Sequence, residues 1–208
     1  MPTPTVPQDR SLSRGTLYDP RGPAARGATH LAQTMQTVLF ICTGNTCRSP
    51  MAEAIARDAL VKGVVKGVDP STFVASAGVA TMDGAPISAE TVEALQRIGI
   101  QFDGRSKRLT AAMLKKADLV LAMTRAHMQA AERLLDEADG LAPGTTSHRN
   151  TAAGSPGPWK GPSRPALHLL DAGGDVPDPV GLGQSAYDRL AAHLSRLIPG
   201  RLSELLAR

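Results

Sequence analysis

A strand, a short loop and a helix start follow one another between residues 37 and 57, where the sequence reads TVLFICTGNTCRSPMAEAIAR. Residues 37–41 are able to form a buried strand, and the turn-forming residues 43–46 end it. Ser49 is a favoured N-cap residue, and Pro50 suits the first helical position, where its missing N–H has no cost. The pattern therefore predicts a strand, a loop and a helix in direct succession.

Such a loop lies against the positive end of the helix that follows it. Backbone N–H groups of a glycine-containing loop, together with a helix N-terminus, form a concavity that suits a phosphate-like oxyanion. The predicted phosphate-binding residues are Thr43, Gly44, Asn45, Thr46, Cys47, Arg48 and Ser49.

Two side chains make this predicted anion site reactive. Cys42 ends the strand, and Arg48 lies six residues further on, so a loop that curls back places a thiol at the floor and a guanidinium at the rim. The helix N-terminus, the N–H donors and the cation favour a reactive thiolate, and Arg48 offers bidentate donors to phosphoryl oxygens. Ser49 can donate to the sulfur, and Asn45 tolerates the left-handed backbone of a tight loop.

A cysteine at a strand end is often only a small buried hydrophobe, and Cys-x5-Arg alone is a weak pattern. The complete order of strand, loop, Ser-Pro and helix favours the reactive interpretation. With it, CTGNTCRSPMAEA resembles the phosphate-binding loop of the low-molecular-weight protein tyrosine phosphatases. Further matches to that family are SAG at 76–78, ADLVLAMT at 117–124 and Asp-Pro at 178–179. The resemblance covers about residues 37–136 and 167–208.

Strand and helix patterns alternate along the rest of the chain. This alternation predicts an α/β domain with a four-stranded parallel sheet, helices on both faces and a ligand at the carboxyl ends of the strands. Helices are expected to about Lys62, from the Ser88 cap to Gly99 with Val92, Leu95 and Ile98 inside, from Thr110, and from Thr124 to Leu135. The last helix begins near Gly183, buries Tyr187, Leu190, Leu194 and Leu197, and is interrupted at Pro199-Gly200. Further strands are expected at 72–76, 118–123 and 166–170.

Asp178, between two prolines, is the predicted general acid and base, and Asp171 and Asp175 are the nearby alternatives. Flanking prolines stiffen the loop that carries this carboxyl. The place of Asp178-Pro179 in the chain matches the resembled family, which implies the catalytic role. Cys42 would attack phosphorus while Arg48 and the loop N–H groups hold the oxygens, and Asp178 would protonate the leaving atom. Asp178 would then activate water against the phosphocysteine.

The substrate class is a phosphorylated protein side chain, phosphoarginine or phosphotyrosine. Tyrosine phosphatases of the resembled family wall the pocket with aromatic residues, whereas this chain has Val180 after Asp-Pro and a non-aromatic loop at 79–82. Thr46 matches the threonine of the resembled family's protein arginine phosphatases, and the alternative is that it is only a packing residue of the loop. For phosphoarginine, Asp178 would meet a guanidinium.

Other functions fit the sequence less well. An arsenate reductase on this loop needs further cysteines for a disulfide relay, and the chain has two, Cys42 and Cys47. A catalytically silent phospho-binding module would be expected to lack Cys42, Arg48 or Asp178. The resemblance implies that Cys42 and Cys47 can form a reversible protective disulfide. No cofactor is expected, and the five histidines show no metal-ligand spacing.

Two segments fall outside the predicted domain at 37–208. Residues 1–36 read as a flexible tail rich in Pro, Gly and Thr, without a signal-peptide pattern, and 139–165 as a low-complexity insertion that carries Trp159. The tail has four arginines against two aspartates and the insertion three basic residues against one aspartate, so together they hold the formal charge of +4. The neutral remainder argues against nucleic-acid binding. A thiolate nucleophile suggests the cytoplasm, and the longest apolar runs are too short to cross a membrane.

Overall fold

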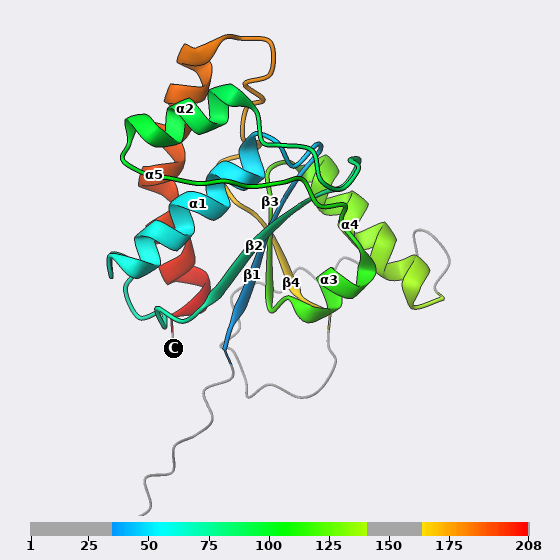
Figure 1. Cartoon of the computed structure of the whole chain (residues 1–208). Helices are drawn as coiled ribbons and strands as arrows, with labels where there is room; N and C mark the ends of the chain where they lie inside the picture. Colours follow the sequence, from blue (N-terminus) through cyan, green and yellow to red (C-terminus); the bar gives the residue numbers. More distant parts are fainter. Residues whose placement is uncertain (1–34, 141–163, 208) are drawn as a thin grey trace, which may run out of the picture. The chain divides into compact units, whose positions relative to one another are not determined.

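The computed structural model of the chain describes residues 35–140 and 164–207. The predicted tail at 1–36, except Met35 and Gln36, and the part of the predicted insertion that contains Trp159 lie outside the described residues. The elements are β1 (Thr37–Cys42), α1 (Arg48–Val61), β2 (Phe73–Gly78), α2 (Ala89–Arg97), α3 (Ala111–Lys116), β3 (Leu119–Ala122), α4 (Arg125–Ala138), β4 (Ala166–Leu169) and α5 (Gln184–Leu206) (Figure 1).

The four strands form one parallel sheet in the order β2-β1-β3-β4. The predicted α/β class and the parallel sheet are thus confirmed. At the carboxyl end of β1, Ile41 lies between Ala77 of β2 and Ala122 of β3. Because all strands point the same way, the loops after β1, β2, β3 and β4 emerge at one edge of the sheet. The predicted phosphate loop follows β1 at this edge.

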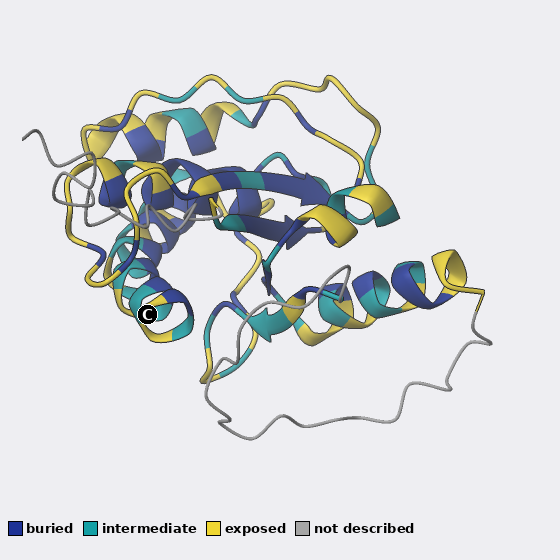
Figure 2. Ribbon diagram, turned by 90° about the horizontal axis from the view of Figure 1, so that it is seen from below, coloured by how far each residue is buried: buried dark blue, intermediate teal, exposed yellow. Residues whose placement is uncertain are grey.

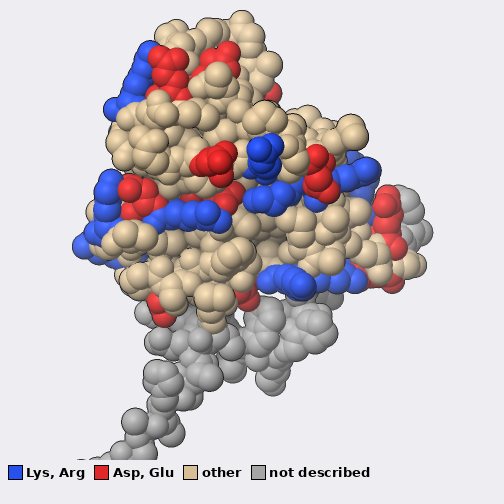
Figure 3. Space-filling view, in the orientation of Figure 1, with Lys and Arg blue, Asp and Glu red and all other residues tan. Residues whose placement is uncertain are grey.

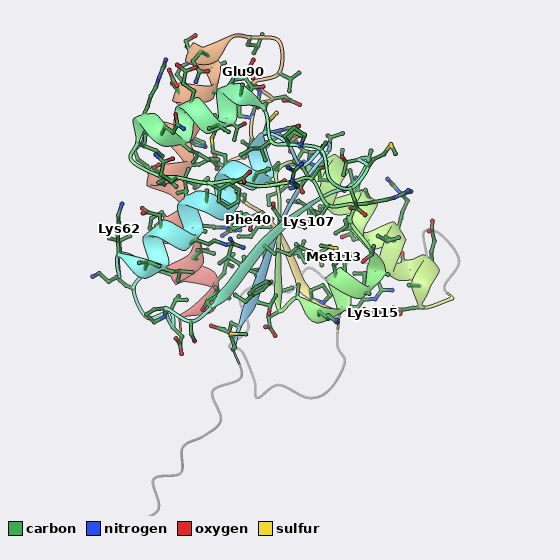
Figure 4. All side chains as sticks on the ribbon, viewed as in Figure 1. Phe40, Lys62, Glu90, Lys107, Met113 and Lys115 are labelled. Atoms are coloured by element: carbon green, nitrogen blue, oxygen red, sulfur yellow. The ribbon has the colours of Figure 1, made fainter. Side chains whose placement is uncertain are left out.

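Alternate residues of β1 serve two separate cores. Val38 and Phe40 pack into the core that includes α1 and α5, and Leu39 and Ile41 into the core that includes α3 and α4. All four are at most 2% exposed. Figure 2 shows the buried strands between helical layers, and Figure 4 labels Phe40 on β1. A strand that buries both faces must be apolar at every position, which explains the uninterrupted run in β1.

Three predicted helix caps are confirmed. The hydroxyls of Ser88, Thr110 and Thr124 each accept a hydrogen bond from the backbone N–H three residues further on, at the starts of α2, α3 and α4. Such caps satisfy a donor that the helix itself leaves unpaired. Helix α4 extends to Ala138, beyond the predicted end at Leu135.

The predicted cap of α1 is wrong. The helix begins at Arg48, its N-cap residue is Cys47, and no side chain caps it. Ser49 is instead the second helical residue, because its hydroxyl contacts the Cys42 sulfur at 2.9 Å rather than a backbone N–H of the helix. Pro50 is accordingly the third helical residue, still within the first turn, where no helical hydrogen bond is lost.

The predicted break in the last helix is also wrong. Helix α5 continues through Pro199 to Leu206. Pro199 removes one helical hydrogen bond, but Ile198 and Leu202 on either side are fully buried in the main core, and this packing stabilises the continuous helix. Ile198 is buried where Leu197 was expected, and Leu197 packs only at the margin of the core.

The predicted end of α2 is shifted, because Ile98 was expected inside the helix and is its C-cap residue. Ile98 follows the last residue of the helix and is 38% exposed, whereas Ile100, beyond the turn at Gly99, is buried. Gly99 has a φ of +81°, and this left-handed turn reverses the side of the chain that faces the core.

Arg164, two residues before β4, forms ion pairs with residues at the end of α4. Its guanidinium lies 2.6 Å from the Asp136 carboxylate and 2.9 Å from that of Asp139. Asp139 also pairs with Lys115 of α3 at 2.7 Å. The Asp136 side chain is only 5% exposed, so this cluster reaches into the protein rather than lying wholly in solvent.

Charged side chains of both signs lie on the face drawn in Figure 3. Groups of Lys and Arg and groups of Asp and Glu are scattered over it and separated by uncharged residues. Among the helices that the structure describes, none combines the length and the apolar character needed to cross a bilayer.

Candidate active site

The carbonyl groups of the loop after β1 point away from its centre. Those of Cys42 and Thr43 accept hydrogen bonds from Val79 and Ala80, in the segment after β2, at 2.9 and 3.0 Å. That of Thr46 accepts from the backbone N–H of Ser88, at the start of α2, at 2.9 Å. Hydrogen bonds from neighbouring segments to these carbonyl groups therefore hold the loop in place.

One amide group of the same loop points to the sulfur. Asn45 directs its N–H to the Cys42 sulfur at 3.3 Å. The N–H groups of Gly44, Thr46, Cys47 and Arg48 have no acceptor among the residues that the structure describes. Free N–H groups beside a helix N-terminus bind anions well. The predicted phosphate-binding residues 43–49 comprise the loop between β1 and α1 and the first two residues of α1.

The Cys42 sulfur lies at the floor of this loop among polar groups. Besides the Asn45 N–H, it contacts the Ser49 hydroxyl at 2.9 Å, as the sequence predicted. Cys42 is 2% exposed, and its side chain also borders the main core. The arrangement suits a nucleophile that a substrate reaches from the loop side.

Asn45 holds the loop in a strained conformation. Its φ of +53° is the one positive φ at a non-glycine residue among those described. Its buried side chain donates to the hydroxyls of Ser49 at 2.9 Å and Ser76 at 2.8 Å, and accepts from the backbone N–H of Lys107 at 2.8 Å. These three bonds use both amide hydrogens and the amide oxygen, and they hold the left-handed backbone in place.

A buried carboxylate lies behind this amide. Ser76 donates to Glu53 of α1 at 2.6 Å, and Glu53 pairs with Arg57 and, at 3.8 Å, with the ammonium of Lys107. Figure 4 labels Lys107 on the segment that pairs with the end of β2. Sequence reasoning did not identify this support, because Glu53 and Lys107 lie 54 positions apart in the chain and the loop motif, which includes Glu53, gives no sign that they meet.

A close approach of two segments makes Gly78 necessary. A Cβ at Gly78 would lie 2.7 Å from the carbonyl oxygen of Thr43 and 2.7 Å from the Thr81 side chain. Real Cβ atoms do not approach backbone so closely, so any larger residue would push the phosphate loop away from β2. The glycine of the SAG motif therefore serves the loop and not only the end of the strand.

Arg48 and Asp178 meet across the mouth of the loop. The Arg48 guanidinium donates to the Asp178 carboxylate at 2.6 Å and to the carbonyl of Val176 at 3.3 Å. The Arg48 side chain is 7% exposed and that of Asp178 is 49% exposed. A second oxygen of Asp178 accepts from the N–H of Val180 at 3.2 Å. The two predicted catalytic residues on either side of Cys42 are thus brought together.

The two alternative aspartates have other partners. Asp175 accepts the backbone N–H of Arg125, the first residue of α4, at 2.9 Å. Asp171 pairs with His193 of α5 at 3.1 Å and with the N–H of Gly173. Neither aspartate contacts Arg48, so neither lies where the predicted general acid and base, Asp178, lies.

His127 is a buried neighbour of the loop that sequence reasoning considered only as a metal ligand. Its Nε2 lies 2.8 Å from the Thr43 hydroxyl and its Nδ1 lies 2.9 Å from the Thr124 hydroxyl. Burial and the nearby Arg48 cation lower the pKa of His127, against the opposing effects of Asp175 and Asp178. The Thr-x-x-His spacing at the start of α4 was the available sequence signal.

Cys47 packs between the loop and α5. Its sulfur lies 3.5 Å from the Tyr187 hydroxyl and 3.8 Å from that of Ser88. Both cysteines are free thiols and both are buried. Burial and the contact with Cys47 raise the pKa of Tyr187 to about 12, so its hydroxyl stays protonated.

The exposed large hydrophobic side chains in the segments after β2 and β4 are not aromatic. Met82, Val180 and Leu182 are 83%, 61% and 64% exposed. Of the aromatic residues within 35–140 and 164–207, Phe40 and Tyr187 are buried, Phe102 packs on the core and Phe73 begins β2 at the far edge of the sheet. The described part of the chain holds no group of three or more His, Cys, Asp or Glu side chains that could bind a metal ion.

Comparison with known proteins agrees with this geometry. A family model described as low molecular weight phosphotyrosine protein phosphatase matches residues 37–141. The protein-arginine-phosphatase of Bacillus subtilis (strain 168) is 42% identical over 92 residues, which are 44% of this chain and 58% of that protein. The low molecular weight protein-tyrosine-phosphatase YfkJ of the same strain is 43% identical over 91 residues, 43% of this chain and 56% of that protein.

Solved structures extend the likeness beyond the aligned segment. A structure described as YwlE arginine phosphatase, a cysteine-to-serine mutant with a phosphorylated active site serine, superposes with a TM-score of 0.61 at 30% identity. That match covers 82% of this chain and 95% of the other. The chain spans 55–60% of the length of the curated relatives that it matches. Since the family model covers about half of the 208 residues and includes the whole loop, the chain belongs to the low molecular weight phosphotyrosine protein phosphatase family.

Proposed function

We propose that this chain is a cysteine-dependent protein phosphatase that works through a phosphocysteine intermediate. The observation that carries the proposal is the convergence of loop N–H groups, the Cys42 sulfur and the Arg48–Asp178 pair at one edge of the sheet. Arg48 and the unpaired amides would hold the equatorial phosphoryl oxygens, where donors stabilise the charge of the transition state. In the neighbouring structure a serine in the active site carries the phosphoryl group, which supports a covalent route.

Each step assigns one task to a residue of the site. The Cys42 thiolate forms the sulfur–phosphorus bond as the bond from phosphorus to the leaving atom breaks, and Asp178 gives its proton to that atom. Asp178, now a carboxylate, takes a proton from water as the water oxygen attacks phosphorus. The sulfur–phosphorus bond breaks and inorganic phosphate leaves. The Ser49 hydroxyl, 2.9 Å from the sulfur, stabilises the thiolate at both ends of the cycle.

A protein side chain is the proposed substrate. Aliphatic side chains at Met82, Val180 and Leu182 flank the mouth and offer contacts to a polypeptide. Beside Asp178 a cavity of about 430 Å³ opens between Pro177, Pro179 and α5. This cavity does not include Cys42 or Arg48, so it adds room for residues next to the phosphorylated one.

Phosphoarginine is the preferred substrate in this proposal. Phosphotyrosine would be expected to stack on aromatic walls, whereas the exposed large hydrophobic residues after β2 and β4, Met82, Val180 and Leu182, are not aromatic. The half-exposed Asp178 carboxylate could pair with the guanidinium of a phosphoarginine. Relatives named for arginine and for tyrosine substrates match at nearly equal identity, 42% and 43%, so identity alone favours neither.

One set of assays tests the activity and the substrate class. The purified protein is offered phosphoarginine and phosphotyrosine peptides of the same sequence, together with Cys42→Ser and Thr46→Ile variants. The proposal expects release of phosphate by the wild type, none by Cys42→Ser, and preference for phosphoarginine that Thr46→Ile shifts toward phosphotyrosine. Turnover that survives Cys42→Ser would overturn the mechanism. Equal preference in the wild type and in Thr46→Ile would overturn the assignment to arginine alone.

A further inference from the structure

Both ring nitrogens of His127 contact hydroxyl groups. Nδ1 lies 2.9 Å from Thr124 Oγ1, within the same helix, and Nε2 lies 2.8 Å from Thr43 Oγ1, in the phosphate loop 84 positions away. The residue is 5% exposed. A buried imidazole whose two nitrogens both have partners is held in one orientation. His127 therefore connects α4 rigidly to the residue that follows Cys42.

The surroundings of His127 favour its neutral form. Burial lowers its pKa most, and the charge of Arg48 lowers it further, while Asp175 and Asp178 oppose these effects. The ring lies in the first turn of α4, where the positive end of the helix also disfavours a cation. One ring nitrogen then carries a hydrogen and the other accepts one.

The Thr124 hydroxyl indicates which nitrogen carries the hydrogen. Its oxygen already accepts the backbone N–H of His127 as the cap of α4, at 3.3 Å. Its own proton is free to be donated to Nδ1. Nε2 then carries the hydrogen and donates it to the Thr43 oxygen. In this arrangement the proton of the exposed Thr43 hydroxyl remains available at the mouth of the loop.

The start of α4 holds the acid loop as well. Asp175 accepts the N–H of Arg125 at 2.9 Å, and the N–H of Val176 donates to the carbonyl of Met123 at 2.8 Å. Asp178 is two residues beyond Val176. One helix end thus fastens the loop that carries Cys42 and the loop that carries Asp178.

We propose that His127 is a positioning residue, which as the Nε2–H tautomer holds Thr43 as a hydrogen-bond donor toward the phosphorylated substrate and keeps the phosphate loop aligned with the acid loop. This inference rests on the proposed phosphatase function. The contact between His127 and Thr43 is independent of activity, so part of its test needs no turnover.

The first experiment is nuclear magnetic resonance of the full chain labelled with 15N at histidine. The expected result at pH 7 is a neutral His127 ring with hydrogen on Nε2, and a change of its ring nitrogen shifts in Thr43→Val. His193, which pairs with Asp171, is the internal control and should not respond to Thr43→Val. A protonated ring, hydrogen on Nδ1, or no response to Thr43→Val overturns the proposal.

The second experiment measures steady-state kinetics with a double-mutant cycle. His127→Ala is expected to lower kcat/KM by about tenfold, the loss of one buried hydrogen bond. Thr43→Val should have a similar effect, and the double variant should be no worse than either single one. His127→Gln, whose amide nitrogen can donate to Thr43, should recover most of the loss. His168→Ala is the matched control, because this half-buried ring on β4 lies near Arg201 and Glu204 and outside the site, and it should stay within twofold of the wild type.

The outcomes separate the inference from the function on which it rests. Additive effects of His127→Ala and Thr43→Val on kcat/KM, or a kcat/KM of His127→Ala within twofold of the wild type, overturn the positioning role and leave the proposed phosphatase activity intact. A wild type without activity on any phosphopeptide overturns the proposed function, and the resonance experiment still decides whether His127 holds Thr43. If His127→Ala does not fold, His127→Gln and Thr43→Val carry the kinetic comparison, and a His127→Gln variant that loses as much activity as Thr43→Val counts against the proposal.

Discussion

Arg48 and Asp178 are 130 positions apart in the chain, yet their side chains form an ion pair of 2.6 Å at the mouth of the phosphate loop. Arg48 is fixed by the first turn of α1, and Asp178 by the short path from β4 to α5. In the proposed reaction this pair must open, because Arg48 grips phosphoryl oxygens and Asp178 carries a proton. The two side chains therefore bind each other until the substrate replaces this pairing, and only then can they assist the reaction.

Asp178→Asn should separate binding from turnover. Loss of the acid is expected to lower kcat by a hundredfold or more, on the order of general acid catalysis. Removal of a negative charge from Arg48 should at the same time tighten inhibition by inorganic phosphate. Initial rates with increasing phosphate measure both effects. Asp58→Asn is the matched control, because Asp58 pairs with Lys62 at the other end of α1 and should change neither quantity. Weaker phosphate inhibition in Asp178→Asn would contradict the competition.

Replacement of Asn45 by alanine and by glycine should separate the loss of its hydrogen bonds from the strain of its backbone. Asn45→Ala loses the buried side-chain bonds and places a Cβ-bearing residue at a φ of +53°, so the free energy of unfolding should fall by about 3 kcal/mol. Asn45→Gly loses the same bonds but accepts the backbone, and should lose about 1 kcal/mol less. Urea unfolding of the two variants measures the difference. Equal losses would show that strain at this position is absent.

The predicted Cys42–Cys47 disulfide stays a prediction, since both thiols are free here. After mild peroxide treatment, the wild type should lose two thiol hydrogens as the sulfurs join, and a dithiol should restore activity. Cys47→Ala should instead progress to irreversibly oxidised Cys42. Peptide mass spectrometry distinguishes the products. Overoxidised Cys42 in the wild type, with no bond to Cys47, would remove the idea.

Stability should depend on pH through His127. Its pKa is lowered below the ordinary 6.5 in the folded state, so below pH 6.5 the unfolded chain binds more protons. The stabilisation is complete above 6.5 and declines as the pH falls toward the folded pKa. Arg48, Asp175 and Asp178 face the ring and set this balance. Thermal melts should give a shallower acid slope for His127→Gln than for the wild type. An identical slope would place the titration elsewhere.

Pro199→Ala should stabilise the protein. An alanine restores the helical N–H that Pro199 lacks inside α5, and it relieves the contact of the ring with the preceding turn. The unfolded chain gains freedom, which offsets part of the effect, so we expect about 1–2 kcal/mol in urea unfolding. Gly200→Ala, at an exposed position with open space around it, should also stabilise, by about 1 kcal/mol. A destabilised Pro199→Ala would mean that the proline ring is needed in the packing.

Local patterns predicted the parts of this fold that local physics determines. The alternating strands and helices, the caps at Ser88, Thr110 and Thr124, and the loop after β1 follow from neighbouring residues. Pro199 was misread because packing of Ile198 and Leu202 outweighs a local penalty, and Ser49 because its hydroxyl contacts Cys42 instead of capping a helix.

Contacts between distant segments could not be predicted in the same way. The sheet order and the links of His127 to Thr43 and of Glu53 to Ser76 depend on which surfaces meet in three dimensions. The meeting of Asp178 with Arg48 was anticipated only through resemblance to a family, not through spacing.

The cluster of Arg164 with Asp136 and Asp139 has a consequence for how this domain can change over time. Asp139 and Arg164 are 25 positions apart in the chain, and their side chains are in contact. The two ends of the stretch that joins them therefore lie at one place on the domain. The sheet sets no requirement on the length of that stretch, and the free-energy cost of closing a loop depends only weakly on its length. Evolution or an engineer could exchange that stretch as a cassette, and the graft would leave the chemistry at the opposite end of β3 untouched.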